Sequence, residues 1–124
     1  MLGIEIDNEK RKLFFDLRID QGGEMIIYHG YKIPIGGVEY TILCDPETVA
    51  NMHNDGDNGQ CNKQRLTIAF SPMMPRWKQT LIHEIVHAIN FEYCCGQLTE
   101  EQVDGMSHGT LQVLEHFSIS MEVR

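Results

Sequence analysis

The sequence predicts a single α+β domain in which a small antiparallel or mixed sheet packs on two helices. In the first half of the chain, apolar residues alternate with polar ones, which is the pattern of half-buried strands. In the second half, two segments carry apolar residues at helical spacing. The length of 124 residues corresponds to one domain, 1–124, and no internal repeat, low-complexity tract or linker divides it.

The two ends of the chain are expected to contribute strands. Apolar and polar residues alternate in residues 2–6 and again in residues 13–19, so residues 1–24 are interpreted as a strand hairpin. Residues 25–28 form the next expected strand. At the other end of the chain, residues 118–124 fit either a frayed helix end or a short strand.

A second hairpin is expected at residues 33–43, because Gly36 and Gly37 can adopt the positive φ angles of a tight turn. Residues 51–63 are polar and contain glycine, so they are interpreted as a surface loop. Residues 66–70 form one more short strand directly before the helical half. Because an extended peptide can add to an exposed sheet edge, this strand is the one expected to pair with a substrate peptide.

The second half of the chain is expected to form two helices. Helical spacing begins at Trp77 and continues to about Tyr93, and Gly96 is expected to end this first helix. Thr99 and Gln102 form a capping box that opens the second helix. The buried stripe of the second helix is expected to comprise Val103, Met106, Thr110, Leu114 and Phe117.

The charge balance narrows the classes of function. The chain has 10 Lys and Arg residues against 18 Asp and Glu residues, a formal net charge of −8. Because an acidic chain repels phosphate backbones, nucleic acid is not an expected partner. No apolar run approaches the ~20 residues of a membrane span, and the N-terminus lacks the pattern of a secretion signal. The expected location is therefore the cytoplasm, with the 4 cysteines as free thiols.

The residues that carry chemistry are concentrated in the first helix, where His83, Glu84 and His87 form an H-E-x-x-H pattern. Residues i and i+4 of a helix lie one above the other, so the two imidazoles converge on a point where zinc accepts nitrogen ligands. Glu84 lies about 100° around the helix from His83, where it can take a proton from water. Bound zinc lowers the pKa of water from 15.7 to about 7, so Zn²⁺ is the expected cofactor and Glu84 the expected catalytic base.

A helical wheel places the two histidines on a face that is free to bind. His83 and His87 lie about 40° apart, whereas the apolar residues of the same helix lie between about 160° and 260° from His83. We therefore expect one face of this helix to pack on the sheet and the opposite face to bind a metal. The competing interpretation is two surface histidines beside an incidental glutamate.

A catalytic zinc site needs a third protein ligand. The candidates all lie on the second helix: Glu100, Glu101, Asp104 and His108. Measured from Val103 at the centre of the apolar stripe, Glu100 lies at about 60° and Glu101 at about 160°. Glu100 flanks the buried face and is the expected ligand, although the helix dipole also favours any acid in a first turn. Asp104, at about 100°, fits either a hydrogen-bond acceptor for a ligand histidine or a solvated acid.

Three stretches of this sequence resemble small zinc-metallopeptidase-like proteins encoded by phages and prophages. They are residues 78–89, which contain the H-E-x-x-H pattern, residues 98–104 and residues 108–114. The proteins in question are distant, minimal relatives of the ImmA/IrrE-type metallopeptidases, within the gluzincin group of zincins. The resemblance covers roughly residues 33–117 and leaves the N-terminal strands outside it.

The resemblance implies a minimal zincin-like fold and a zinc-dependent peptidase. Gluzincins carry the third zinc ligand in an E-x-x-x-D pattern on a following helix, and Glu100 and Asp104 stand at that spacing here. In ImmA-like proteins the substrate is a repressor of a phage or mobile element. The resemblance therefore implies a protein substrate, and a transcriptional repressor in particular.

Two questions stay open at the level of sequence. A peptidase needs a donor that stabilises the tetrahedral oxyanion, and Tyr93 and His108 are the candidates for this role. The alternative to a peptidase is a catalytically inactive, zinc-stabilised domain that binds another protein. A third alternative is a structural protein whose histidines bind no metal.

Overall fold

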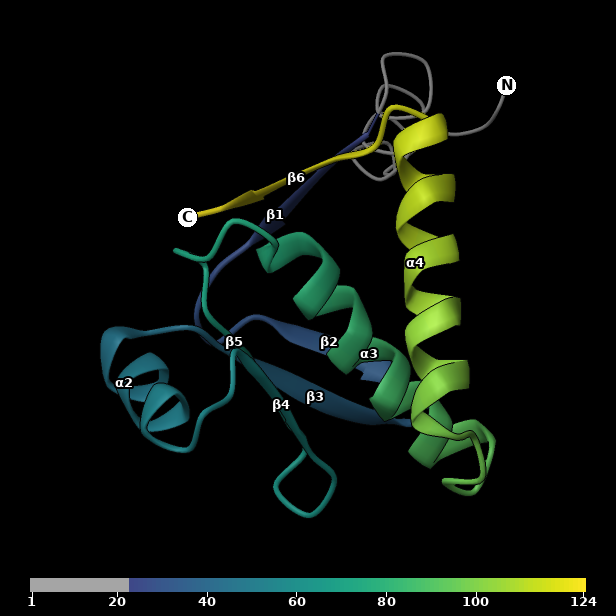
Figure 1. Cartoon of the computed structure of the whole chain (residues 1–124), viewed down its shortest axis with the longest axis horizontal. Helices are drawn as coiled ribbons and strands as arrows, with labels where there is room; N and C mark the ends of the chain where they lie inside the picture. Colours follow the sequence, from purple (N-terminus) through teal and green to yellow (C-terminus); the bar gives the residue numbers. More distant parts are fainter. Residues whose placement is uncertain (1–22) are drawn as a thin grey trace, which may run out of the picture.

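The computed structural model describes residues 23–124, so the hairpin expected at residues 1–24 lies outside the described residues except for its last two positions. The described part of the chain forms an α+β fold with three helices and six strands in two small sheets, which confirms the expected class. The helix α3 (Trp77–Tyr93) lies between the larger sheet and the helix α4 (Glu100–His116) (Figure 1). None of the helices in residues 23–124 combines the length and the apolar composition needed to cross a membrane.

The larger sheet has four strands in the order β2-β3-β5-β4. β2 (Lys32–Ile35) and β3 (Val38–Leu43) form the expected antiparallel hairpin, and both glycines of its turn have positive φ. β5 (Thr67–Phe70) runs parallel to β3. β4 (Gly59–Asn62) pairs antiparallel with β5 and lies at the edge of the sheet.

The expectation that residues 66–70 form a substrate-binding edge is wrong. Within the described part of the chain, β5 is an internal strand, because β3 pairs with one side of it and β4 with the other. An internal strand has no unpaired backbone groups for a peptide to use. The edge on that side of the sheet belongs to β4 instead.

The interpretation of residues 51–63 as a surface loop is also wrong. This segment contains β4 and the last four residues of the helix α2 (Pro46–Asn54), which is capped by the side chain of Asp45. Both elements are short and polar, and α2 buries only Met52. Their local pattern is therefore too weak to distinguish them from a loop, and packing against the rest of the domain selects their structure.

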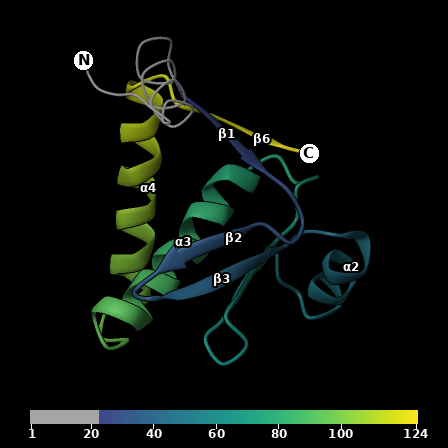
Figure 2. The same cartoon turned by 180° about the vertical axis from the view of Figure 1, so that it is seen from behind.

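The second sheet joins the two ends of the described chain. β1 (Glu24–Ile27) pairs in parallel with β6 (Ser120–Val123), and the two strands lie side by side in both views (Figures 1 and 2). Residues 118–124 therefore end in a strand rather than in a frayed helix. Met121 of β6 and Ile27 of β1 are buried, so this small sheet also contributes to the core.

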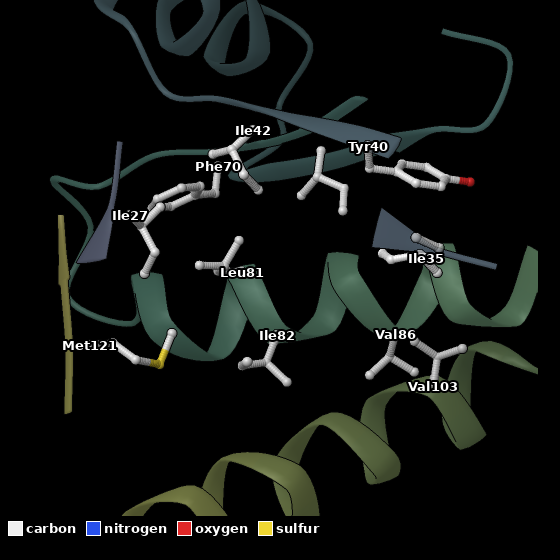
Figure 3. Close-up of a cluster of buried hydrophobic side chains, with 12 residues drawn as sticks. Ile27, Ile35, Tyr40, Ile42, Phe70, Leu81, Ile82, Val86, Val103 and Met121 are labelled. Atoms are coloured by element: carbon white, nitrogen blue, oxygen red, sulfur yellow. The ribbon is translucent and has the colours of Figure 1, made fainter. Parts of the chain in front are cut away.

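The helices α3 (Trp77–Tyr93) and α4 (Glu100–His116) lie where the sequence predicts them. α3 is the centre of the fold: Leu81 points towards the sheet, whereas Ile82 and Val86 point towards α4 (Figure 3). The capping box at the start of α4 makes both of its hydrogen bonds. The two longest helices therefore pack directly on each other, and of these two it is α3 that covers the sheet.

The buried face of α4 differs from the expected stripe. Val103 is fully buried as expected, but Met106 and Phe117 are 47% and 64% exposed. The side that faces α3 instead includes Ser107, which is 0% exposed and bonded to Gln79. Because Ser107 finds a hydrogen-bond partner, it can be buried in place of an apolar residue. This turns the buried face by about 40° from Val103 towards Glu100 and Asp104.

Candidate metal centre

The two histidines of the H-E-x-x-H pattern lie on the face of α3 that meets the first turn of α4. Their Nε2 atoms both face the carboxylate of Glu100. His83 Nε2 lies 2.8 Å from Oε2 of Glu100, and His87 Nε2 lies 3.1 Å from Oε1. The structure therefore brings together the three residues that the sequence proposed as ligands, and it selects Glu100 among the candidates on α4.

The donor set could hold a metal ion. All three donor atoms lie within 4.8 Å of one another. Burial lowers the pKa of His87, which favours the neutral imidazole that binds metals. Imidazole nitrogens and carboxylate oxygens are both ligand types that metal ions accept in proteins.

Asp104 takes the position that a supporting hydrogen-bond acceptor requires. Its Oδ1 atom lies 3.3 Å from Nδ1 of His83, the ring nitrogen opposite the one that faces Glu100. A proton on Nδ1 that is shared with Asp104 leaves the lone pair of Nε2 for a metal. Of the two interpretations left open for Asp104, this proximity favours the acceptor.

Glu84 lies beside this cluster and is buried, with 9% of its surface exposed. Gly59 of β4 passes close to its side chain: a Cβ atom at Gly59 would lie 2.9 Å from Oε2 of Glu84. Burial raises the pKa of Glu84 to about 7; the charges of Glu100 and Asp57 add to this shift, and His83 opposes it. A carboxyl group with a pKa near neutrality can both accept and return a proton.

A polar network ties α4 to α3 next to the ligands. The side-chain amide of Gln79 donates to Oγ of Ser107 at 2.9 Å and lies 3.3 Å from Nδ1 of His108. The same His108 nitrogen lies 2.9 Å from the backbone oxygen of Asp104. His108 is therefore placed beside Asp104 and not among the metal-facing atoms.

The other candidates lie away from the cluster. Glu101 is exposed and does not belong to the group of donor atoms. Tyr93 is 69% exposed and follows His87 by six residues, or roughly 9 Å along the helix axis. Among the described residues, none of the 4 cysteines joins the metal-binding group, and all 4 are free thiols. The structure thus supports neither Glu101 as a ligand nor Tyr93 as an oxyanion donor.

Sequence reasoning missed the contribution of β4 and the residues before it. Gly59 packs on Glu84, and Asp57 acts on the same carboxylate through its charge. The one available signal was the glycine itself, because a glycine in a strand often marks a close approach of another group. That signal could be used only if residues 59–62 were recognised as a strand.

The chain was compared with protein-family models, with curated proteins and with solved structures, and none of the three comparisons finds a match.

Proposed function

We propose that the protein is a zinc-dependent peptidase of the gluzincin type, in which His83, His87 and Glu100 hold the metal and Glu84 is the general base. The observation that carries this proposal is the convergence of three donor atoms on one point beside a buried carboxyl group. The proposal is further supported by the two acids of α4, because Glu100 faces Nε2 of His83 and Asp104 lies 3.3 Å from Nδ1 of the same ring.

The roles of the side chains follow from their positions. A bound zinc ion would supply a water activated for attack and polarise the scissile carbonyl. Glu84 would accept the proton of that water at its carboxylate and later return it to the leaving amine. Gly59 lies so close to the Glu84 side chain that it leaves little room for the base to move towards β4.

The edge strand β4 is the place where a substrate would bind. Within the described residues, β4 pairs with β5 on one side and with no strand on the other. An extended peptide added to this free edge would run past Gly59, and therefore past Glu84. This supports a flexible or locally unfolded segment of a protein as substrate, since only an extended chain can pair in this way. The resemblance to ImmA-like proteins is the support for a transcriptional repressor in the cytoplasm as that substrate.

Metal content is the first test, measured by elemental mass spectrometry on protein purified without a histidine tag. The unmodified chain should hold about one zinc ion. His83→Ala should abolish binding and Glu100→Ala should weaken it, because each removes one of three donors. Glu101→Ala is the matched control: it removes an acid from the same helical turn and should leave the zinc content unchanged. A chain that holds no zinc even after reconstitution would contradict the proposal.

Catalysis is tested with Glu84→Gln, which preserves the shape of the side chain but removes the base. This variant should keep its zinc and lose peptide hydrolysis. If neither the zinc-loaded chain nor the variant cleaves unstructured proteins, the metal serves a protein-interaction domain instead.

A further inference from the structure

An open depression of about 310 Å³ lies where α2 ends and β4 begins. Its lining residues are His53, Gly56, Asp57, Asn58 and Met74, and we call it the Asp57 pocket. Its walls are held by backbone hydrogen bonds. Asp57 N–H donates to the carbonyl of Met52 at 2.9 Å, Gly56 N–H donates to that of His53 at 3.0 Å, and Ser71 N–H donates to that of Asn58 at 3.1 Å. The pocket is therefore part of the folded framework.

The Asp57 pocket lies next to the proposed catalytic base. Asn58 directly precedes Gly59, and the Cβ position of Gly59 is 2.9 Å from the carboxylate of Glu84. The pocket is thus at the N-terminal end of the edge strand, one residue before the point where that strand touches Glu84. The charge of Asp57 also acts on Glu84, which agrees with this proximity.

The chemistry of the pocket suits a cation on an apolar stem. Asp57 is exposed, and its Oδ2 atom accepts one hydrogen bond, at 3.0 Å, from the side-chain amide of Gln60. A carboxylate has about four acceptor sites, so others remain free. No ion pair within residues 23–124 joins Asp57 to a Lys or Arg of this chain. Met74 is partly buried and offers an apolar wall on which methylene groups can pack.

We propose that the Asp57 pocket binds a Lys or Arg side chain of the substrate, at the residue next to the bond that is cleaved. This inference rests on the proposed peptidase function and adds a substrate class to it. An acidic side chain would be repelled by Asp57 in a chain that already carries a net charge of −8. An apolar side chain would cover the carboxylate without pairing it, which costs free energy.

The experiment uses the full, zinc-loaded chain and a library of randomised peptides, with cleavage sites read by mass spectrometry. Lys and Arg should be enriched at one position adjacent to the cleaved bond. Asp57→Asn should lower kcat/KM for a Lys peptide about tenfold relative to the matched Gln peptide, the fold-change expected for losing a hydrogen bond to a charged group. Any effect of Asp57 on Glu84 changes the cleavage of both peptides equally. The ratio of the two kcat/KM values therefore reports only the contribution of the Asp57 pocket.

Asp55→Asn is the control variant, because Asp55 also contacts Gln60 but does not line the pocket. It removes the same charge two residues away and should leave the Lys-to-Gln ratio unchanged. Cleavage without a basic preference, or equal losses with both peptides in Asp57→Asn, overturns this inference and leaves the peptidase standing. An absence of cleavage of any peptide by the zinc-loaded chain overturns the peptidase and the inference together.

Discussion

His83 is held between two acids of α4: its Nδ1 atom lies 3.3 Å from Oδ1 of Asp104, while its Nε2 atom faces Glu100. The two acids stand four positions apart, so they present their carboxylates from the same side of α4 on successive turns. Asp104 does not itself belong to the donor cluster, and it is placed to orient the imidazole of His83.

The first prediction concerns this supporting contact. Asp104→Ala should weaken zinc binding about 10- to 100-fold, because the ring of His83 loses the acceptor that orients it. The dissociation constant is measured by competition with a chromophoric chelator. Glu101→Ala removes the same charge from the same helix and should bind zinc as the unmodified chain does. An unchanged affinity in Asp104→Ala would show that Asp104 is a solvated acid after all.

The second prediction concerns removal of the metal. A ligand that binds only the folded state stabilises it by about 2.7 kcal/mol when its free concentration is 100 times its dissociation constant. A chelator should therefore lower the melting temperature of the zinc-loaded chain, measured by calorimetry. His83→Ala should melt at the same temperature with and without chelator. Identical melting of the unmodified chain under both conditions would indicate that its histidines bind no metal.

The third prediction contrasts two glycines. Gly59→Ala places a Cβ atom 2.5 Å from Cγ2 of Thr80 and 2.9 Å from Oε2 of Glu84, so β4 or the base must move. We expect a loss of about 1–3 kcal/mol in the free energy of unfolding, as for other overpacked sites, together with a loss of hydrolysis. At Gly105 in α4, by contrast, a Cβ atom would have no neighbouring atom within 4 Å. Gly105→Ala should therefore gain about 0.5–1 kcal/mol from helix propensity, as measured by urea unfolding.

The fourth prediction concerns alkaline pH. Tyr40 is fully buried and donates its hydroxyl to Oε2 of Glu92 at 2.8 Å. Burial, assisted by Glu92, raises the pKa of Tyr40 far above its ordinary value of 10.0, so it stays protonated in the folded chain. The unfolded chain releases this proton near pH 10, and the stability that Tyr40 contributes is therefore complete below that pH and decreases above it.

The test is the urea midpoint of unfolding between pH 7 and 11. Tyr40→Phe should lose about 1 kcal/mol at pH 7, where a hydrogen bond is missing, and should depend less on pH above 10. Burial also raises the pKa of Cys61, to about 12, so part of the alkaline loss should remain in this variant. Tyr28→Phe is the control, because Tyr28 is 47% exposed. Equal slopes in Tyr40→Phe and the unmodified chain would contradict the prediction.

The sequence by itself determined the two long helices and the candidate metal ligands on them. α3 and α4 are each 17 residues long, and a helical spacing of apolar residues can be recognised over that length. The spacing of His83 and His87 follows from the geometry of one helix, and so does the capping box at Thr99. Each of these features depends on residues within one or two turns of each other, which is why a local pattern was sufficient.

Only the tertiary structure decided which residues complete the site. The buried face of α4 could not be located by apolar spacing, because Ser107 is buried through its hydrogen bonds while Met106 is left exposed. The turn of that face is what brings Asp104 within reach of His83. The position of β4 at the sheet edge depends on its pairing with β5.

The parallel pairing of β1 with β6 also could not be predicted from the sequence, because the two strands are nearly one hundred residues apart in the chain. The residues of one strand do not indicate which distant strand it pairs with. A strand of four residues is also too short for its alternation of apolar and polar residues to be recognised reliably. The contact of Gly59 with Glu84, and with it the Asp57 pocket, exists only because packing places β4 across α3.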